Sequence, residues 1–78
     1  MIEALASRLT QRVLLVEDDA ALRHALGAVL GAAGMDVMQV ADGRAAVDAF
    51  DHTVDVVVLD VMLPGLDGFE VCRWIRQR

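Results

Sequence analysis

Several residue types are missing or scarce in this 78-residue chain, and each absence excludes a class of protein. There is no lysine, so all seven positive charges are arginines, and the net charge at pH 7 is -5. Direct nucleic-acid binding needs a basic stripe, which this acidic balance argues against. The single cysteine, Cys72, can form neither an internal disulfide nor a metal cluster by itself. We interpret it as a small buried hydrophobe.

Long hydrophobic runs are absent as well. The richest stretch, residues 54–63, is interrupted by two aspartates and is shorter than the roughly 20 apolar residues that cross a bilayer. Residues 1–11 have neither the apolar centre nor the small-residue cleavage site of a secretion signal. We therefore expect a cytoplasmic protein with no membrane contact, in which residues 1–11 are a leader and residues 12–78 form the folded part.

Three apolar segments have the composition of β-strands. Val13–Val16 is a continuous apolar run, as in a strand covered on both faces, Val56–Leu59 is an even more apolar run, and a shorter strand is expected at 37–40. Each is followed by a helical pattern, and these patterns span residues 22–33, 46–50 and 69–75. The alternation predicts an α/β fold of the flavodoxin-like, doubly wound type, limited to β-α-β-α-β-α, with a parallel sheet in strand order 2-1-3.

The first helical pattern carries start and stop signals. Asp19 stands where a side-chain oxygen can cap the first turn, and Gly34 stands where glycine commonly ends a helix. Apolar residues with helical spacing run from Leu22 to Ala33 and predict one buried face. Asp67 is interpreted as the cap of the third helix.

Three acidic residues follow strands that should be neighbours. Glu17 and Asp18 follow the first strand, and Asp60 follows the third. In an open parallel sheet, sites form beyond the carboxyl ends of the strands, so the three carboxylates should meet. Clustered carboxylates repel one another, and Mg²⁺, which prefers oxygen ligands, removes that cost. One carboxylate could then act as nucleophile toward a phosphoryl group that shares the metal.

Taken together, these motifs resemble the receiver domains of two-component response regulators. The resemblance covers about residues 12–78 and rests on three linked motifs, which are VLLVEDD at 13–19, ADG at 41–43 and DVVVLDVMLPGLDG at 55–68. Glu17 and Asp18 alone would be ordinary acids at a helix N-terminus. Their combination with the long motif around Asp60 makes coincidence improbable.

The resemblance implies a function for each motif. Asp60 would accept a phosphoryl group from a histidine kinase in a phosphorelay, so the chain would be a signalling domain and not an enzyme beyond self-catalysed phosphotransfer. Glu17 and Asp18 would hold Mg²⁺ together with Asp60, with Asp18 a direct ligand, and Met62 would add its backbone carbonyl. The Glu-Asp pair and the loop after Asp60 resemble the subclass that regulates transcription through a winged-helix DNA-binding output domain.

The resemblance also implies parts that these 78 residues do not contain. The family has five β/α units, with a Ser or Thr after the fourth strand and a Lys after the fifth that contact the phosphoryl group. This chain reaches the third helix and has no lysine. We therefore expect it not to be competent alone. The third strand, Val56–Leu59, would lie at an edge of the sheet, so we expect either a longer protein or self-association through that edge.

Two other functions stay open from the residues alone. An aspartate-nucleophile phosphatase or dehalogenase would use a related parallel sheet, but such phosphatases usually carry a second acid two residues after the nucleophile, and that position is Met62. A binding or dimerisation module that has lost phosphorylation would explain the missing lysine.

Overall fold

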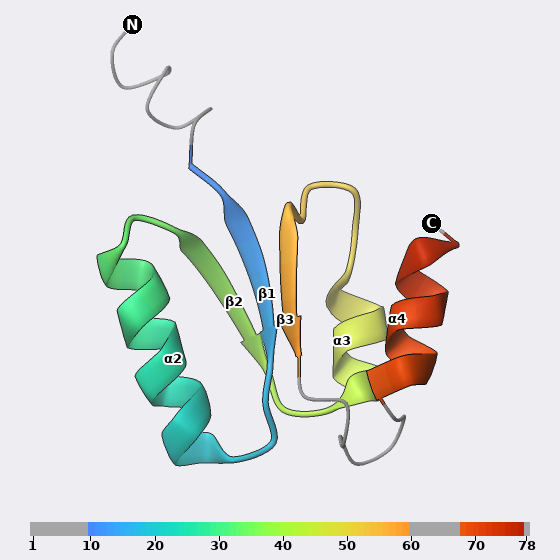
Figure 1. The fold of residues 1–78 in the computed structure, drawn as a ribbon, viewed down its shortest axis with the longest axis horizontal. Helices are drawn as coiled ribbons and strands as arrows, with labels where there is room; N and C mark the ends of the chain where they lie inside the picture. Colours follow the sequence, from blue (N-terminus) through green and yellow to red (C-terminus); the bar gives the residue numbers. More distant parts are fainter. Residues whose placement is uncertain (1–9, 60–67, 78) are drawn as a thin grey trace, which may run out of the picture.

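The computed structural model describes residues 10–59 and 68–77. Within these ranges, strands and helices alternate as predicted (Figure 1). The elements are β1 (Arg12–Val16), α2 (Ala20–Ala32), β2 (Asp36–Val40), α3 (Gly43–Ala49), β3 (Val56–Leu59) and α4 (Gly68–Arg76). β1 and β2 each begin one residue earlier than their apolar runs, because backbone pairing extends to Arg12 and Asp36, which are partners in the register.

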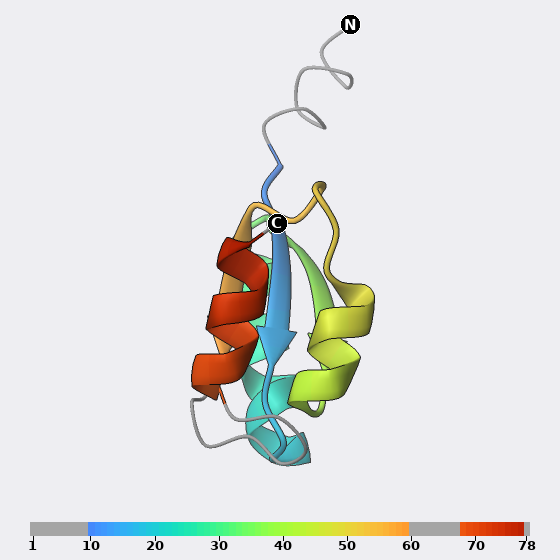
Figure 2. The ribbon, with the colours of Figure 1, turned by 90° about the vertical axis from the view of Figure 1, so that its right-hand side faces the viewer.

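The three strands form a parallel sheet in the order β2-β1-β3, which confirms the predicted topology. β1 is the central strand, and its last residue, Val16, is paired with Val40 of β2 and with Leu59 of β3. The sheet separates two helical layers (Figure 1). α2 packs over β1 and β2 on one face, and Figure 2 shows α3 and α4 side by side over the other.

The core is centred on β1. Val13, Leu14, Leu15 and Val16 are each at most 2% exposed, because neighbouring strands flank β1 on both sides and helices cover both faces. Alternation of side chains sends Leu14 and Val16 toward α3, where they pack around the buried Ala46. The carboxyl end of β1 is therefore fixed by the most completely buried segment among the described residues.

Both ends of α2 follow the sequence signals. The Asp19 carboxylate Oδ1 accepts a hydrogen bond from the backbone N of Leu22 at 2.9 Å, so Asp19 is the N-cap as predicted. At the other end, Gly34 has φ +92° and its N–H donates to the carbonyl of Gly31, while the Met35 N–H donates to Leu30. This pair of bonds is a Schellman ending, which needs a left-handed residue that glycine supplies without strain.

The apolar face of α2 is only partly buried, contrary to the expectation of one buried face. Leu22 is 47% exposed and Val29 is 67% exposed, whereas Gly27 is the buried residue of this helix. The cause is the width of the sheet, because α2 covers β1 and β2 but not β3. On β3, Val56 and Val58 are exposed by more than a third as well. Among the described strands β3 pairs with β1 alone, so it lies at an edge of the sheet as expected.

Candidate functional site

The β1–α2 connection holds Glu17 from several sides. The Glu17 N–H donates to the Val40 carbonyl at 3.1 Å, which extends the β1–β2 pairing by one residue. The Glu17 carbonyl accepts a hydrogen bond from Arg23 Nη1 at 2.9 Å. The carboxylate Oε1 accepts a third bond from the Asp19 N–H at 3.3 Å. Glu17 is only 8% exposed, so it anchors the connection.

Asp18 has the opposite environment. It is exposed, and no residue in ranges 10–59 and 68–77 hydrogen-bonds its carboxylate. Its neighbours Glu17 and Asp19 are both fixed by hydrogen bonds. Asp18 is therefore an open carboxylate at the carboxyl end of the central strand, held between two anchored residues.

Two of the predicted site residues, Asp60 and Met62, lie outside the described residues, as does the predicted cap Asp67. The sheet register nevertheless bears on Asp60, because Val16 is paired with Leu59. These two residues immediately precede Glu17 and Asp60 in the sequence. Within the described ranges, no group of three His, Cys, Asp or Glu side chains could hold a metal ion, and the predicted set of three includes Asp60.

Asp42 is the next acid at this edge, two residues beyond the end of β2. It belongs to the ADG motif at residues 41–43. In the structure, Asp42 caps α3, with its Oδ1 accepting from the Ala45 N–H at 2.7 Å, and Gly43 begins the helix. Its carboxylate is thus engaged in capping, unlike that of Asp18.

The contact of Arg23 with the β1–α2 connection was not predicted from the sequence. This half-buried residue lies in the first turn of α2 and reaches back to the Glu17 carbonyl. The only signal in the sequence is an arginine placed one turn into the helix that follows the acidic pair. An arginine on a solvated helix face gives the same pattern, so only the structure distinguishes the two.

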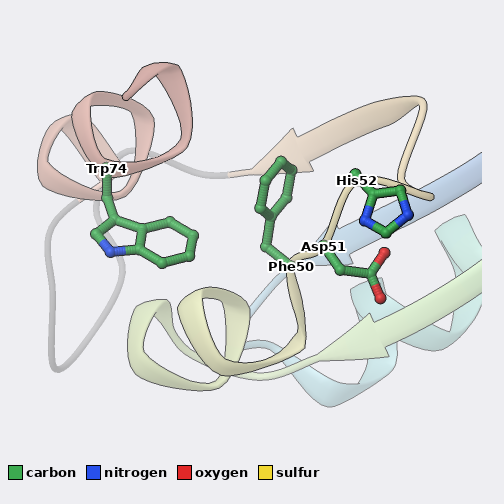
Figure 3. A pocket seen from close by; sticks show the side chains of 4 residues that line it. All are labelled: Phe50, Asp51, His52 and Trp74. Carbon is green, nitrogen blue, oxygen red and sulfur yellow. The ribbon is translucent and has the colours of Figure 1, made fainter. Parts of the chain in front are cut away.

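A hollow of about 440 Å³ lies elsewhere, beside the connection from α3 to β3. Phe50, Asp51, His52 and Trp74 line it, and Figure 3 shows Phe50 between Trp74 and His52. Phe50 and Trp74 pack edge to face with ring centroids 5.8 Å apart. Hydrogen bonds from Thr53 to Asp51 lower the pKa of the Asp51 carboxyl below its ordinary value. This connection leads to the start of β3, whereas Glu17 and Asp18 follow the end of β1.

The fold agrees with that of known proteins. The family model described as the response regulator receiver domain matches residues 13–78. This chain belongs to the response regulator receiver domain family. The resemblance drawn from the sequence motifs is thereby confirmed, and the receiver is a domain of two-component signalling.

Curated relatives of this receiver are transcriptional regulators. It is 52% identical over 68 residues to the transcriptional regulatory protein TcrA of Mycobacterium tuberculosis, covering 86% of this chain and 27% of TcrA. It is 45% identical over 67 residues to the DNA-binding response regulator MtrA of the same species, covering 85% of this chain and 29% of MtrA. The chain therefore spans less than a third of these relatives.

Solved receivers share the fold. The chemotaxis response regulator CheY4 of Vibrio cholerae matches with a TM-score of 0.83 and 34% identity, over 88% of this chain and 58% of CheY4. The receiver domain of HemR from Leptospira biflexa matches with a TM-score of 0.84 and 32% identity, over 87% of this chain and 56% of that domain. A further match, TrrA, was solved in complex with the histidine kinase ThkA, with a TM-score of 0.80 and 31% identity over 88% of this chain and 60% of the matched chain.

Family membership carries general properties. Receiver domains are signalling modules that typically bind Mg²⁺ and pair with histidine kinases. No helix in the described part of this chain is long and apolar enough to cross a membrane.

Proposed function

We propose that this receiver accepts a phosphoryl group on Asp60 from a histidine kinase. The observation that carries the proposal is the pairing of Val16 with Leu59, which precede the acidic pair and Asp60 respectively. Asp18 is exposed at the end of β1, and its carboxylate accepts no hydrogen bond from any described residue. Family membership supports the same role.

The donor set fits Mg²⁺. Asp18 is an unengaged hard oxygen donor, and we propose it as a direct ligand, with Asp60 and the backbone carbonyl of Met62 completing the protein's share. Mg²⁺ usually keeps several waters and takes one or two carboxylates plus phosphate oxygens. Glu17 is buried and its carboxylate already accepts a hydrogen bond from the Asp19 N–H. This suits a residue that supports the site while Asp18 is the direct ligand. When bound, the cation would neutralise charge on the transferred group.

The transfer itself demands little of the protein beyond positioning. A carboxylate oxygen of Asp60 would attack the phosphorus of a phosphohistidine on the kinase. The new O–P bond forms as the N–P bond breaks, and the histidine nitrogen leaves with the electron pair of that bond and takes a proton from solvent. The product on this chain is an acyl phosphate.

Intact-mass measurement after incubation with acetyl phosphate tests this function. In a longer form that carries all five β/α units, we expect one phosphoryl adduct with Mg²⁺, none with a chelator and none after Asp60→Asn, whereas we propose that the 78 residues alone are not competent. Asp48→Asn, which changes an exposed carboxylate on α3, should leave the reaction of the longer form unchanged. An adduct after Asp60→Asn, or no adduct on the longer form when CheY4 reacts under the same conditions, would reject the proposal.

A binding module without phosphorylation is the second candidate, favoured by the absence of lysine from the chain. Beryllofluoride separates the two, because an acceptor aspartate forms a Mg²⁺-dependent adduct and a module that has lost the site does not. An aspartate-nucleophile phosphatase remains the third, and sustained release of phosphate from acetyl phosphate or p-nitrophenyl phosphate would favour it.

The wider protein context is also part of the proposal. We propose residues 1–11 as a leader and residues 12–78 as the first three β/α units of the receiver, in a cytoplasmic protein. The printed names of TcrA and MtrA support a downstream DNA-binding output, of the winged-helix kind, in a full-length form. For the 78 residues alone, we propose self-association through β3, since its outer edge pairs with no other described strand.

A further inference from the structure

The Arg23 side chain contacts the β1–α2 connection, which carries Glu17 and Asp18. It is in the first turn of α2, and its Nη1 spans six residues back to the Glu17 carbonyl at 2.9 Å. The contact is partly buried. It therefore joins the helix to the end of the central strand, across the residues that we propose to hold the cation.

This hydrogen bond acts on the peptide unit that joins Glu17 to Asp18. The Glu17 carbonyl and the Asp18 amide belong to one planar peptide unit, so fixing the oxygen also fixes the plane from which Asp18 begins. Glu17 is already held on its other side by the bond from its N–H to Val40 and by burial of its side chain. The Arg23 bond fixes the Glu17 carbonyl, and with it the peptide unit that leads to Asp18. After Asp18, the backbone is fixed again by Asp19, which caps α2.

We infer that Arg23 is a positioning residue for this site: its hydrogen bond to the Glu17 carbonyl orients Asp18 toward the cation. The inference rests on the proposed function for its consequence, metal binding, but its geometric content stands without it. Arg23 does not touch the phosphoryl group or the cation in this arrangement, and acts through the Glu17–Asp18 peptide.

Three variants separate the hydrogen bond from the charge. Arg23→Met removes both, Arg23→Lys keeps the charge and one donor group, and Arg23→Gln keeps a donor without the charge. Arg44→Met is the matched control, because Arg44 is an exposed arginine in α3 and its removal changes net charge equally. The urea midpoint of each variant shows whether the fold as a whole has been weakened.

Two measurements on the full chain then test the inference. By nuclear magnetic resonance, we expect the order parameter of the Asp18 amide to fall in Arg23→Met from the rigid range near about 0.85 toward the flexible range below about 0.6. Arg23→Lys, whose donor has nearly the same reach, should retain it, and the shorter Arg23→Gln should lie between Arg23→Lys and Arg23→Met. Mg²⁺ titration should show affinity about tenfold weaker in Arg23→Met, the size typical of lost supporting contacts around a metal site. Arg44→Met should change neither quantity.

The outcomes are distinct. If Arg23→Met leaves both the Asp18 order parameter and the Mg²⁺ affinity at wild-type values, the inference is wrong. It is also wrong if Arg44→Met lowers both quantities as much as Arg23→Met does, since the loss of positive charge alone then acts. If wild type binds no Mg²⁺, the proposed function fails, and the order parameter of Asp18 alone decides whether Arg23 positions it.

Discussion

Arg12 and Asp55 are joined by two hydrogen bonds at the amino ends of β1 and β3. The Asp55 N–H donates to the Arg12 carbonyl at 2.8 Å, and the Arg12 N–H donates to the Asp55 carboxylate Oδ2, also at 2.8 Å. The Arg12 side chain extends the contact, with Nη1 donating to Thr53 Oγ1 and Nε paired with Asp36 at 3.3 Å. One residue thus links the beginnings of all three strands.

Removing the Asp55 carboxylate should weaken the sheet at this end. The bond from the Arg12 N–H is charge-assisted but exposed, so we expect Asp55→Ala to lower the free energy of unfolding by about 1 kcal/mol, within the usual range for one hydrogen bond. Asp55→Asn keeps an acceptor and should lose less. Urea unfolding followed by circular dichroism measures both. Asp48→Ala, on an exposed helical site, is the control, and equal losses in Asp55→Ala and Asp48→Ala would contradict the assignment.

The turn at Asp51 should respond to acid. Hydrogen bonds from the Thr53 side chain and backbone lower the pKa of Asp51, so its ionised form is favoured in the folded state. Its contribution is fully present above the ordinary carboxyl pKa of about 3.9 and is lost as the pH falls through the lower folded-state pKa. In Thr53→Ala, which removes the hydroxyl donor, an NMR titration should show the pKa of Asp51 moving up toward that of a free carboxyl. An unshifted pKa of Asp51 in this variant would refute the cause given.

Gly27 should tolerate alanine but nothing larger. A Cβ at this position would lie 2.2 Å from Nε2 of Gln39, the far end of a flexible and exposed side chain. Displacing that amide is cheap, and alanine gains about 1 kcal/mol of helix propensity over glycine, so Gly27→Ala should change the free energy of unfolding by less than about 1 kcal/mol.

The double variant makes the test sharper. With Gln39 already shortened, Gly27→Ala in the Gln39→Ala background should be stabilising, whereas Gly27→Leu in wild type should be clearly destabilising through overpacking against β2. Thermal unfolding of wild type, the three single variants and the double variant measures these differences. A Gly27→Leu protein as stable as wild type would show that α2 does not sit close to β2.

Self-association through β3 should depend on its exposed face. Val58 is 37% exposed on this outer strand. A charged side chain on an edge strand disfavours its pairing with another chain. We expect sedimentation velocity at micromolar concentration to show wild type as a dimer or larger and Val58→Lys as mainly monomer. Val29→Lys, at the 67% exposed position on α2, should associate as wild type. A wild-type chain that stays a folded monomer would reject the edge as an interface.

Strand order and sheet type were predictable because they follow from local composition. The runs Val13–Val16 and Val56–Leu59 have the apolar composition of strands in a parallel sheet, and alternation with helices leaves few topologies. The partial exposure of α2 was not predictable from its pattern. Periodicity tells which residues share a face, but the extent of burial depends on how far the neighbouring layer reaches, and that layer ends at β3.

The candidate site was likewise predictable only in part. The motifs located Glu17 and Asp18 at the end of β1, but two adjacent acids are equivalent in a sequence. The structure separates them, because the Glu17 N–H continues the strand pairing to Val40 and its side chain stays buried, whereas Asp18 follows after pairing has ended. Arg23 could not be found from sequence, since its contact depends on the angle at which α2 leaves the strand.

The central place of β1 has a consequence for synthesis on the ribosome. β1 leaves the exit tunnel first, yet its second neighbour is completed only at Leu59. Until then, the emerging chain holds a two-stranded ribbon with one side of its most apolar strand unpaired, and such transient edges attract chaperones or other nascent chains. The acidic connection is made early, but β3, the strand that precedes Asp60 in the sequence, is the last of the three strands to emerge.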